Sequence, residues 1–366
     1  MADTSFAPLY PRAPLPVEIV LHPSWWHKHT GMIFDEDFFF HPSKRVEAER
    51  KMEKVLYEKW GRYGLGRDRD KDLPVVGAVH LAAGFMVSEM LGCRVEYLED
   101  ASPQVICAED ATLSVVPSRA FESPVFKKFL KLLDALKAKY GYLLGDVNWN
   151  GILNVALDLR GQDIFLALHD NPFETQSFFR SIAEVLDGLS GRVQAETGST
   201  SISVNRNVAN FTEPLYLHSE CSLTMISEND YEKHLLPFDI KWSAAKRPFG
   251  VHYCGADPHR FAKSFAKIPK LEFLDLGWGG DVGLLRRHLP NTFFNLRLSP
   301  IEFADWSPAE IDATVRRLVL ESGNPMLTGV CCINLDDRVG DDQIEALFKS
   351  VHELREELCR TGISRT

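Results

Sequence analysis

The sequence of 366 residues lacks the features that mark several large classes of protein. No apolar run approaches the roughly 18 residues that suggest a membrane-spanning helix, and residues 1–20 lack the basic start and apolar centre of a signal peptide. Runs rich in Lys and Arg are also missing, and 51 acidic against 41 basic residues give a formal charge of −10. Such a surface does not neutralise nucleic-acid phosphates well. We therefore expect a cytoplasmic protein that binds neither membranes nor nucleic acids.

The sequence also lacks the usual phosphate-binding fingerprints. No G-x-G-x-x-G stands between an apolar run and a helix, and no P-loop is present, so a dinucleotide or nucleoside-triphosphate site has no support. Cysteine is present, but the seven cysteines are an odd number in a large chain without a signal peptide. Metal binding, catalysis or burial is therefore a better expectation for them than a disulfide framework.

What the sequence does contain is an alternation of short apolar runs with capped helices. Four helix starts pair a capping side chain with proline: Ser123-Pro124, Asn171-Pro172, Asp257-Pro258 and Ser307-Pro308. Buried strands are expected at 140–147, 215–223, 249–255, 271–277, 292–298 and 327–335. This rhythm is typical of a parallel α/β sheet, and we predict a single (β/α)8 TIM barrel, with an open sheet as the rival architecture.

The first 70 residues have a different composition. Proline is dense up to Pro23, an aromatic stretch follows, and a helix is expected from about residue 43 to residue 63. We expect residues 1–70 to form an extension that packs over the barrel, and residues 71–366 to form the barrel itself. The rings of Trp26 and His27 are candidates for substrate binding in a lid; a second metal site and ordinary packing are the alternatives for this histidine-rich stretch.

The strongest local signal for chemistry is His252-Tyr253-Cys254. Side chains at i and i+2 of a strand face the same way, so His252 and Cys254 can bind one metal ion, and this ligand pair is typical of zinc. Both lie at the end of a predicted strand, where α/β barrels build their active sites. A second thiol source, Cys331-Cys332, lies late in another strand, and alternation lets only one of the two face the site, with a slight preference for Cys332. Ordinary burial is the alternative for each of these residues.

Other strand ends supply further polar candidates. His218 and Glu220 share a face, and Glu220 is a fourth zinc ligand, a general acid or a salt-bridged carboxylate. Asp146, Asn148 and Trp149 follow another strand end and suit substrate orientation, although Trp149 also fits a packed loop aromatic. We assign candidate roles as follows: catalytic, Glu220, His218 and Asp146; substrate-binding, Asn148, Trp149, Trp26, His27 and Tyr253; metal-binding, His252, Cys254, Cys332 and Cys331.

With these pieces in place, the chain resembles the uroporphyrinogen decarboxylase superfamily, most nearly its zinc-dependent, corrinoid-linked methyltransferase branch. The matching segments include 77–105, 145–173, ECSLTMISENDYEKHLLPF at 220–238, VHYCG at 251–255 and CCINLDDRVGDDQIEAL at 331–347. The resemblance implies a (β/α)8 barrel with zinc held by an H-x-C pair plus a later cysteine. These positions map onto His252, Cys254 and either Cys331 or Cys332.

The arginine-rich N-terminal motif with which true uroporphyrinogen decarboxylases bind propionates is not found, which disfavours haem-pathway decarboxylation. The leading hypothesis is a zinc-dependent methyltransferase that moves a methyl group between a small substrate and a separate corrinoid protein. An aryl methyl ether, in an O-demethylation, and a thiol acceptor both remain open as substrates, and a homodimer is compatible with the sequence. The alternatives are a metal-free lyase of the decarboxylase type, which uses Asp146 and the histidines to stabilise a protonated intermediate, and a non-catalytic, zinc-stabilised binding barrel.

Overall fold

The computed structural model describes residues 6–69, 71–199 and 205–360. Its main sheet has six parallel strands in the order β1-β8-β7-β6-β5-β4. These strands are β1 (Val17–Leu21), β4 (Tyr216–Ser219), β5 (Phe249–His252), β6 (Phe273–Leu276), β7 (Phe293–Leu298) and β8 (Thr328–Leu335). A separate antiparallel pair joins β2 (Arg94–Glu96) to β3 (Gln104–Ile106). Five of the predicted strands are therefore confirmed as β4 to β8.

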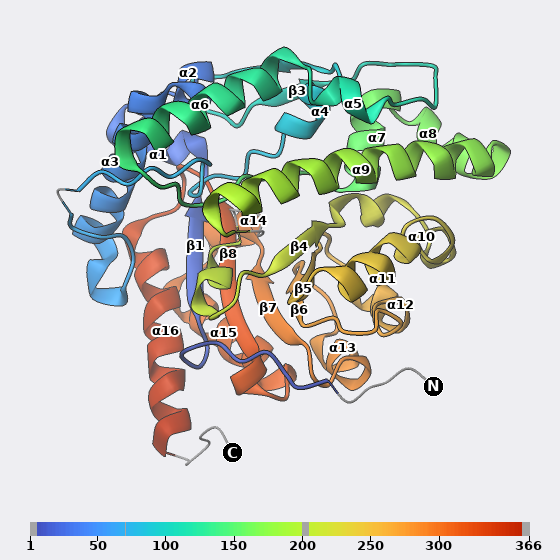
Figure 1. Ribbon diagram of the computed structural model, residues 1–366. Coiled ribbons are helices and arrows are strands. Elements are labelled where there is room, and N and C mark those ends of the chain that lie inside the picture. The colour runs from blue at the N-terminus through green and yellow to red at the C-terminus, as the bar shows by residue number, and fades with distance from the viewer. Residues whose placement is uncertain (1–5, 70, 200–204, 361–366) are drawn as a thin grey trace.

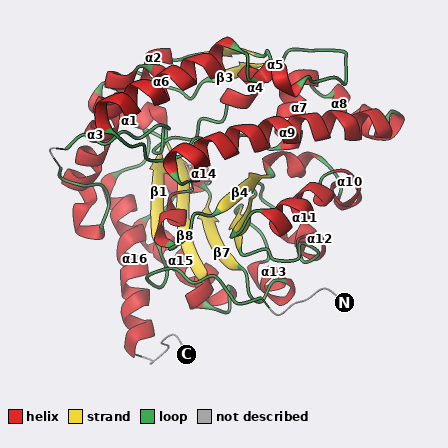
Figure 2. Ribbon diagram, in the orientation of Figure 1, coloured by secondary structure: helices red, strands yellow, loops and turns green. Residues whose placement is uncertain are grey.

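The helices surround this sheet, as Figure 2 shows by colour. The first half of the chain contains α1 (Pro23–Thr30), α2 (Glu36–Phe40), α3 (Pro42–Trp60), α4 (Met86–Met90), α5 (Pro117–Ala120), α6 (Pro124–Tyr140), α7 (Ile152–Arg160), α8 (Asp163–Asp170) and α9 (Pro172–Thr197). The second half contains α10 (Glu228–His234), α11 (Leu236–Ala245), α12 (Ala262–Phe265), α13 (Val282–His288), α14 (Pro300–Asp305), α15 (Pro308–Glu321) and α16 (Asp341–Arg360). Short 3₁₀ turns are η1 (Gly61–Tyr63), η2 (Arg206–Asn210), η3 (Cys221–Met225), η4 (Pro258–Phe261) and η5 (Pro325–Leu327).

Figure 1 shows α6 and α9 crossing above the sheet, with α16 beside β1 and β8 and α10 to α13 on the side of β4. The predicted caps at Ser123 and Ser307 are confirmed, the latter as a complete capping box with Glu310. The predicted helix near 43–63 is confirmed as α3 and η1. Among the described helices, none combines the length and the apolar character needed to cross a membrane.

The structure confirms the predicted parallel α/β sheet, but it does not show a complete eight-stranded barrel. Between the edges β4 and β1 the described residues contain no further strand of this sheet, only an isolated parallel bridge between Val75 and Leu144. The strand expected at 140–147 is reduced to that bridge. Gly141 and Gly145 both adopt positive φ, 81° and 83°, which interrupts the extended backbone on either side of Leu144.

The expected N-terminal extension also needs a correction. Strand β1 lies within residues 1–70, yet it pairs with β8 along its whole length and is an integral part of the main sheet. The five residues of β1 follow a proline-rich stretch, so the sequence offers too short an apolar pattern to separate a strand from a loop. Helices α1 to α3 follow β1 in this region.

The two faces of the sheet differ in polarity. One face presents Val251, Leu274 and Leu296, all at most 2% exposed, in the apolar core. The opposite face, which we call the inner face, carries polar side chains that neighbour one another in the register: Ser219 pairs with His252, His252 with Asp275, and Asp275 with Asn295; Arg297 pairs with Cys331, and Cys331 with Glu18. The sheet thus collects polar groups from six strands on one face.

Candidate metal centre

Three potential ligands meet at the ends of β4 and β5. The sulfur atoms of Cys221 and Cys254 and a ring nitrogen of His252 all lie within 4.8 Å of one another. His252 is the last residue of β5, Cys254 follows two residues later, and Cys221 opens η3 directly after β4. The Cys254 Sγ lies 2.9 Å from the His252 Nε2. The structure thus brings His252 and Cys254 together as predicted, and adds Cys221.

This donor set fits zinc. Zinc is usually bound tetrahedrally at about 2.3 Å from sulfur and about 2.0 Å from nitrogen, which separates neighbouring ligand atoms by about 3.5 to 3.8 Å. The cluster lies within 4.8 Å, so small side-chain adjustments suffice to reach these separations. One imidazole and two thiolates also leave a fourth coordination position for a substrate.

Asp275 fixes the orientation of the imidazole. The Nδ1–H of His252 donates to the Asp275 carboxylate, which leaves Nε2 directed towards Cys254. Asp275 is fully buried, and its Oδ1 accepts a hydrogen bond of 2.9 Å from the Asn295 side chain, while Arg297 forms an ion pair with Oδ2. A carboxylate behind a metal-binding histidine sets the tautomer and raises the basicity of the ring. Every part of this arrangement comes from the inner face.

The surroundings favour a thiolate at Cys254. A hydrogen bond from Cys221, together with the charges of His252 and Arg297, holds the pKa of Cys254 well below its ordinary value. The same contact with Cys254, reinforced by burial, raises the pKa of Cys221. Although burial opposes it, the charges of Cys254 and Asp275 raise the pKa of His252 to about 9. One proton is therefore held between the thiols and one on the imidazole, and a bound cation displaces both.

Cys331 and Cys332 lie outside this group. The Cys331 thiol is on the inner face, where it accepts a hydrogen bond of 3.2 Å from Asn295 and lies 3.8 Å from Asp275 Oδ1. Cys332 points the other way and contacts the carbonyl of Leu298 at 3.7 Å. The slight preference for Cys332 is wrong because its position in the strand directs it away from the inner face. The Cys331 sulfur contacts Asp275 and is not part of the group formed by Cys221, His252 and Cys254. That Cys331 is a ligand stays a prediction.

His218 and Glu220 form a separate buried group on the outer side of β4. His218 Nδ1 donates to Asp239 Oδ1 at 2.7 Å, and Tyr231 donates to Asp239 Oδ2 at 2.6 Å. Burial, and then the nearby charge of Asp239, raises the pKa of Glu220 well above its ordinary value. The structure therefore does not bring Glu220 to the cysteines as a fourth ligand. A role for Glu220 or His218 in proton transfer stays a prediction.

The remaining predicted residues are mostly packed. Trp149 is 3% exposed and donates to the carbonyl of Leu217, as expected of a packed loop aromatic. Tyr253 is fully buried, and its hydroxyl donates to Asp257 at 2.6 Å. Asp146 accepts a hydrogen bond from Ser199, and burial raises its pKa to about 7. Of these three residues and Asn148, Asp146 alone combines burial with a pKa suited to proton transfer near neutral pH.

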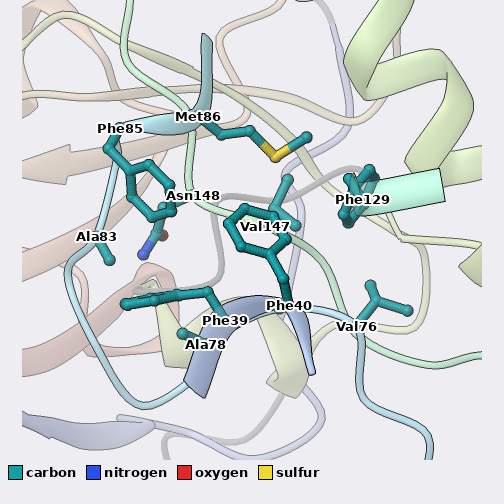
Figure 3. A pocket seen from close by; sticks show the side chains of 11 residues that line it. Phe39, Phe40, Val76, Ala78, Ala83, Phe85, Met86, Phe129, Val147 and Asn148 are labelled. Carbon is teal, nitrogen blue, oxygen red and sulfur yellow. The ribbon is translucent and has the colours of Figure 1, made fainter. Parts of the chain in front are cut away.

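Asn148 lines a small apolar cavity, shown in Figure 3. Its side chain donates to the carbonyl of Leu81 at 2.6 Å. The rings of Phe39 and Phe40 from α2 and of Phe85 surround the space, whose volume is about 30 Å³. That volume holds a water molecule or two but no aromatic substrate. The cavity is thus a packing gap of the N-terminal half.

The aromatic N-terminal stretch is packed as well. Trp26 is 1% exposed and lies edge-on to Trp25 at 5.1 Å, and Trp25 contacts Trp60 of α3. The ring of His27 is hydrogen-bonded to the carbonyl of Met32 at 3.0 Å. A substrate-binding lid needs an accessible ring face, and Trp26 has none, so the packing interpretation of this stretch is the better one.

Comparison with known proteins gives a fold but no family. No family model matches the sequence, and no curated protein does. A B12-independent methionine synthase from Shewanella sp. W3-18-1, in complex with selenomethionine, aligns over 96% of this chain and 99% of its own with 10% identity. Its TM-score of 0.47 is too low to show a shared fold. A methyltransferase from Methanosarcina mazei has a TM-score of 0.62 and 13% identity over 96% of this chain and 95% of its own. The chain therefore shares its overall fold with that methyltransferase.

Proposed function

We propose that this protein is a zinc-dependent methyltransferase and that Cys221, His252 and Cys254 hold its zinc ion. The observation that carries the proposal is the convergence of two sulfurs and one ring nitrogen at the strand ends, with the imidazole fixed from behind by Asp275. The fold shared with a solved methyltransferase supports this choice of reaction class. The resemblance of the sequence to the zinc-dependent methyltransferases points the same way.

A thiol is the substrate that this donor set favours. A bound zinc ion supplies a Lewis acid with an open position, which lowers the pKa of a coordinated thiol. Zinc binds thiolate sulfur readily, and the guanidinium of Arg297, 5% exposed, adds positive charge beside Cys254. Both effects favour a thiolate. The packing of Trp26 leaves no open ring face in the N-terminal stretch for an aromatic ether.

In the proposed reaction the substrate thiol loses its proton and its sulfur bonds to the methyl carbon. The bond between that carbon and its donor breaks, and the donor keeps the electron pair. We propose, from the family resemblance, that the donor is the methylated corrinoid of a separate protein, whose cobalt takes the electron pair. The roles of this chain are to present the thiolate, through the three ligands, and to keep the imidazole oriented, through Asp275.

The test is the zinc that is released when the thiols are titrated with a mercurial, because this measures thiolate-bound zinc alone. We expect about one zinc per chain in the wild type and far less in Cys221→Ser and Cys254→Ser. Cys331→Ser is the matched control, a buried inner-face thiol outside the cluster, and should keep its zinc. A reduced wild-type protein without thiolate-bound zinc would refute the proposal. Loss of zinc only in Cys331→Ser would mean that Cys331, the later cysteine predicted from the sequence, is a zinc ligand in place of Cys221.

Activity is tested with methylcobalamin as the methyl donor and a panel of small thiols as acceptors. The wild type should consume methylcobalamin in a thiol-dependent way, and Cys254→Ser should not, while remaining folded by circular dichroism. A Cys254→Ser protein that unfolds would instead favour the zinc-stabilised binding barrel.

One observation favours a second candidate, the metal-free lyase. Asp146 is a buried carboxyl with a pKa of about 7, and its Oδ1 has no hydrogen-bond partner, which suits a group that donates a proton to a substrate. This candidate predicts a decarboxylation that survives removal of zinc and is lost in Asp146→Asn. The methyltransferase predicts the opposite response to zinc removal.

A further inference from the structure

A second cluster of potential ligands lies apart from the cysteines, between α3 and the segment that follows Val75. It consists of Glu49 and Glu53 of α3 and of His80, which are 3%, 6% and 5% exposed. Glu49 and Glu53 are four residues apart, so both carboxylates project from one face of the helix. His80 reaches the same point from outside the helix. Two separate parts of the chain thus direct three ligand groups into one buried place.

The three groups form close ion pairs, but their geometry leaves two buried atoms without a hydrogen bond. His80 Nε2 lies 2.9 Å from Glu53 Oε1 and 3.3 Å from Glu49 Oε1, and the three ligand atoms fit within 4.8 Å. Nevertheless, His80 Nε2 and Glu49 Oε2 are both buried without a hydrogen-bond partner of acceptable geometry. Buried polar atoms nearly always have such partners, and an exception calls for an explanation. A cation that all three ligands face supplies one.

Two arginines lie near the carboxylates of this cluster but do not form hydrogen bonds with them. Arg45 Nη2 lies 3.7 Å from Glu49 Oε2, and Arg206 Nη2 lies 3.8 Å from Glu53 Oε1. Both distances exceed a hydrogen bond. Arg45 also approaches the oxygen of Glu49 that is not the one nearest to His80. Glu18 of β1 is a third carboxylate nearby, and Arg355 is a third guanidinium that acts on it. The three converging donor groups, and not a net charge, therefore indicate a cation.

We propose that Glu49, Glu53 and His80 form a second metal site, which binds a divalent first-row cation such as Mn²⁺. Two carboxylate oxygens and one imidazole nitrogen are donors that manganese accepts, whereas a site with two thiolates selects zinc. The two sites therefore prefer different ions. A metal here ties α3 of the N-terminal region to the segment at His80. Its role is structural, and it does not depend on the methyltransferase proposal.

The test is a titration of chelator-treated full-length protein with Mn²⁺, in which the electron paramagnetic resonance signal of free Mn²⁺ is lost on binding. We expect about one bound Mn²⁺ per chain in the wild type and also in Cys254→Ser, because the thiol site is not involved. Glu53→Gln should weaken binding at least tenfold. The matched control is Glu58→Gln, an exposed carboxylate on the same helix, whose side chain is 60% exposed, and it should bind Mn²⁺ as the wild type does.

The competing explanation is a protonated His80 that bridges the two carboxylates with no metal. It predicts no Mn²⁺ binding and no rise in melting temperature on addition of Mn²⁺ to wild type or Cys254→Ser, and that result would overturn the proposal. Both proteins keep the cluster intact, so this outcome is decisive even if Glu53→Gln does not fold. Equal binding by folded Glu53→Gln would also overturn the assignment. Loss of thiolate zinc with retained Mn²⁺ binding would refute only the methyltransferase site.

Discussion

Replacing Asp275 by Asn should weaken zinc binding without removing a ligand. The carboxylate of Asp275 accepts the Nδ1–H of His252, a hydrogen bond from Asn295 and the ion pair from Arg297. Asparagine keeps the shape but loses the charge, so the imidazole becomes less basic and its orientation less fixed. Losing such a partner typically costs about 10- to 100-fold in metal affinity, which corresponds to about 1.4 to 2.7 kcal/mol.

The same change removes the buried carboxylate that pairs with Arg297, which destabilises the fold by itself. The assay must therefore separate the two effects. Zinc affinity is measured by competition with a chromophoric chelator, and stability by urea unfolding of the chelator-treated protein. The matched control is Glu272→Gln, because Glu272 is also a buried carboxylate paired with an arginine, Arg247, but at the opposite end of the same strands. It should lose stability and keep its zinc affinity.

The reasoning about Asp275 would be refuted by an Asp275→Asn protein that binds zinc as tightly as the wild type. It would also be refuted if Glu272→Gln lost as much zinc affinity as Asp275→Asn, because the effect would then be one of general destabilisation. A loss far above 100-fold would mean that Asp275 acts on the metal more directly than through His252.

Three further predictions concern stability. Burial raises the pKa of Asp146 to about 7, whereas an aspartate carboxyl in the unfolded chain has a pKa of about 4. Between these two pH values the folded state binds more protons than the unfolded state. The free energy of unfolding therefore falls as pH rises from about 4 to about 7. Asp146→Asn should remove this decline, a gain over wild type of about 2 to 4 kcal/mol at pH 7.5 relative to pH 4 in urea unfolding; an unchanged pH profile would contradict it. Ser307→Ala removes the hydroxyl that accepts a hydrogen bond from the Glu310 backbone N–H, and should lower the free energy of unfolding by about 1 kcal/mol in the same assay. Tyr231→Phe removes a buried donor to Asp239 and should cost about 1 to 3 kcal/mol while thiolate-bound zinc stays unchanged.

Most of the second half of the fold could be predicted from the sequence. Apolar runs such as 292–298 and 327–335 are long, rich in β-branched or aromatic residues, and bounded by capped helices. The local sequence is therefore enough to predict these strands. The strand at 140–147 fails because Gly141 and Gly145 take backbone conformations that no apolar count reveals. Strand β1 was missed because its pairing with β8 joins residues more than 300 positions apart. Such a long-range contact leaves no local signal.

The candidate site was predicted in part for a related reason. The i, i+2 rule placed His252 and Cys254 on one face without knowledge of any other strand. The sequence did not single out Cys221, because the polar candidates of β4, His218 and Glu220, alternate with it along the chain. The register corrects this: Ser219 pairs with His252, so Ser219 and not His218 lies on the inner face, and Cys221, two residues further, comes beside Cys254. Knowing which strands are neighbours would have been enough to find it.

The buried pair of Asp275 and Arg297 is difficult to explain by stability alone. Both side chains are at most 5% exposed, and a buried ion pair seldom stabilises a fold more than apolar side chains of similar volume would. The position of the pair in the sheet offers a reason. Asp275 is the direct register neighbour of His252, and Arg297 lies on the same face, within 3.2 Å of the His252 ring. Arg297 pairs with Asp275, Asp275 keeps His252 oriented, and His252 faces the two cysteines. The polar inner face therefore serves the ligand group at the strand ends, while the apolar outer face supplies the core.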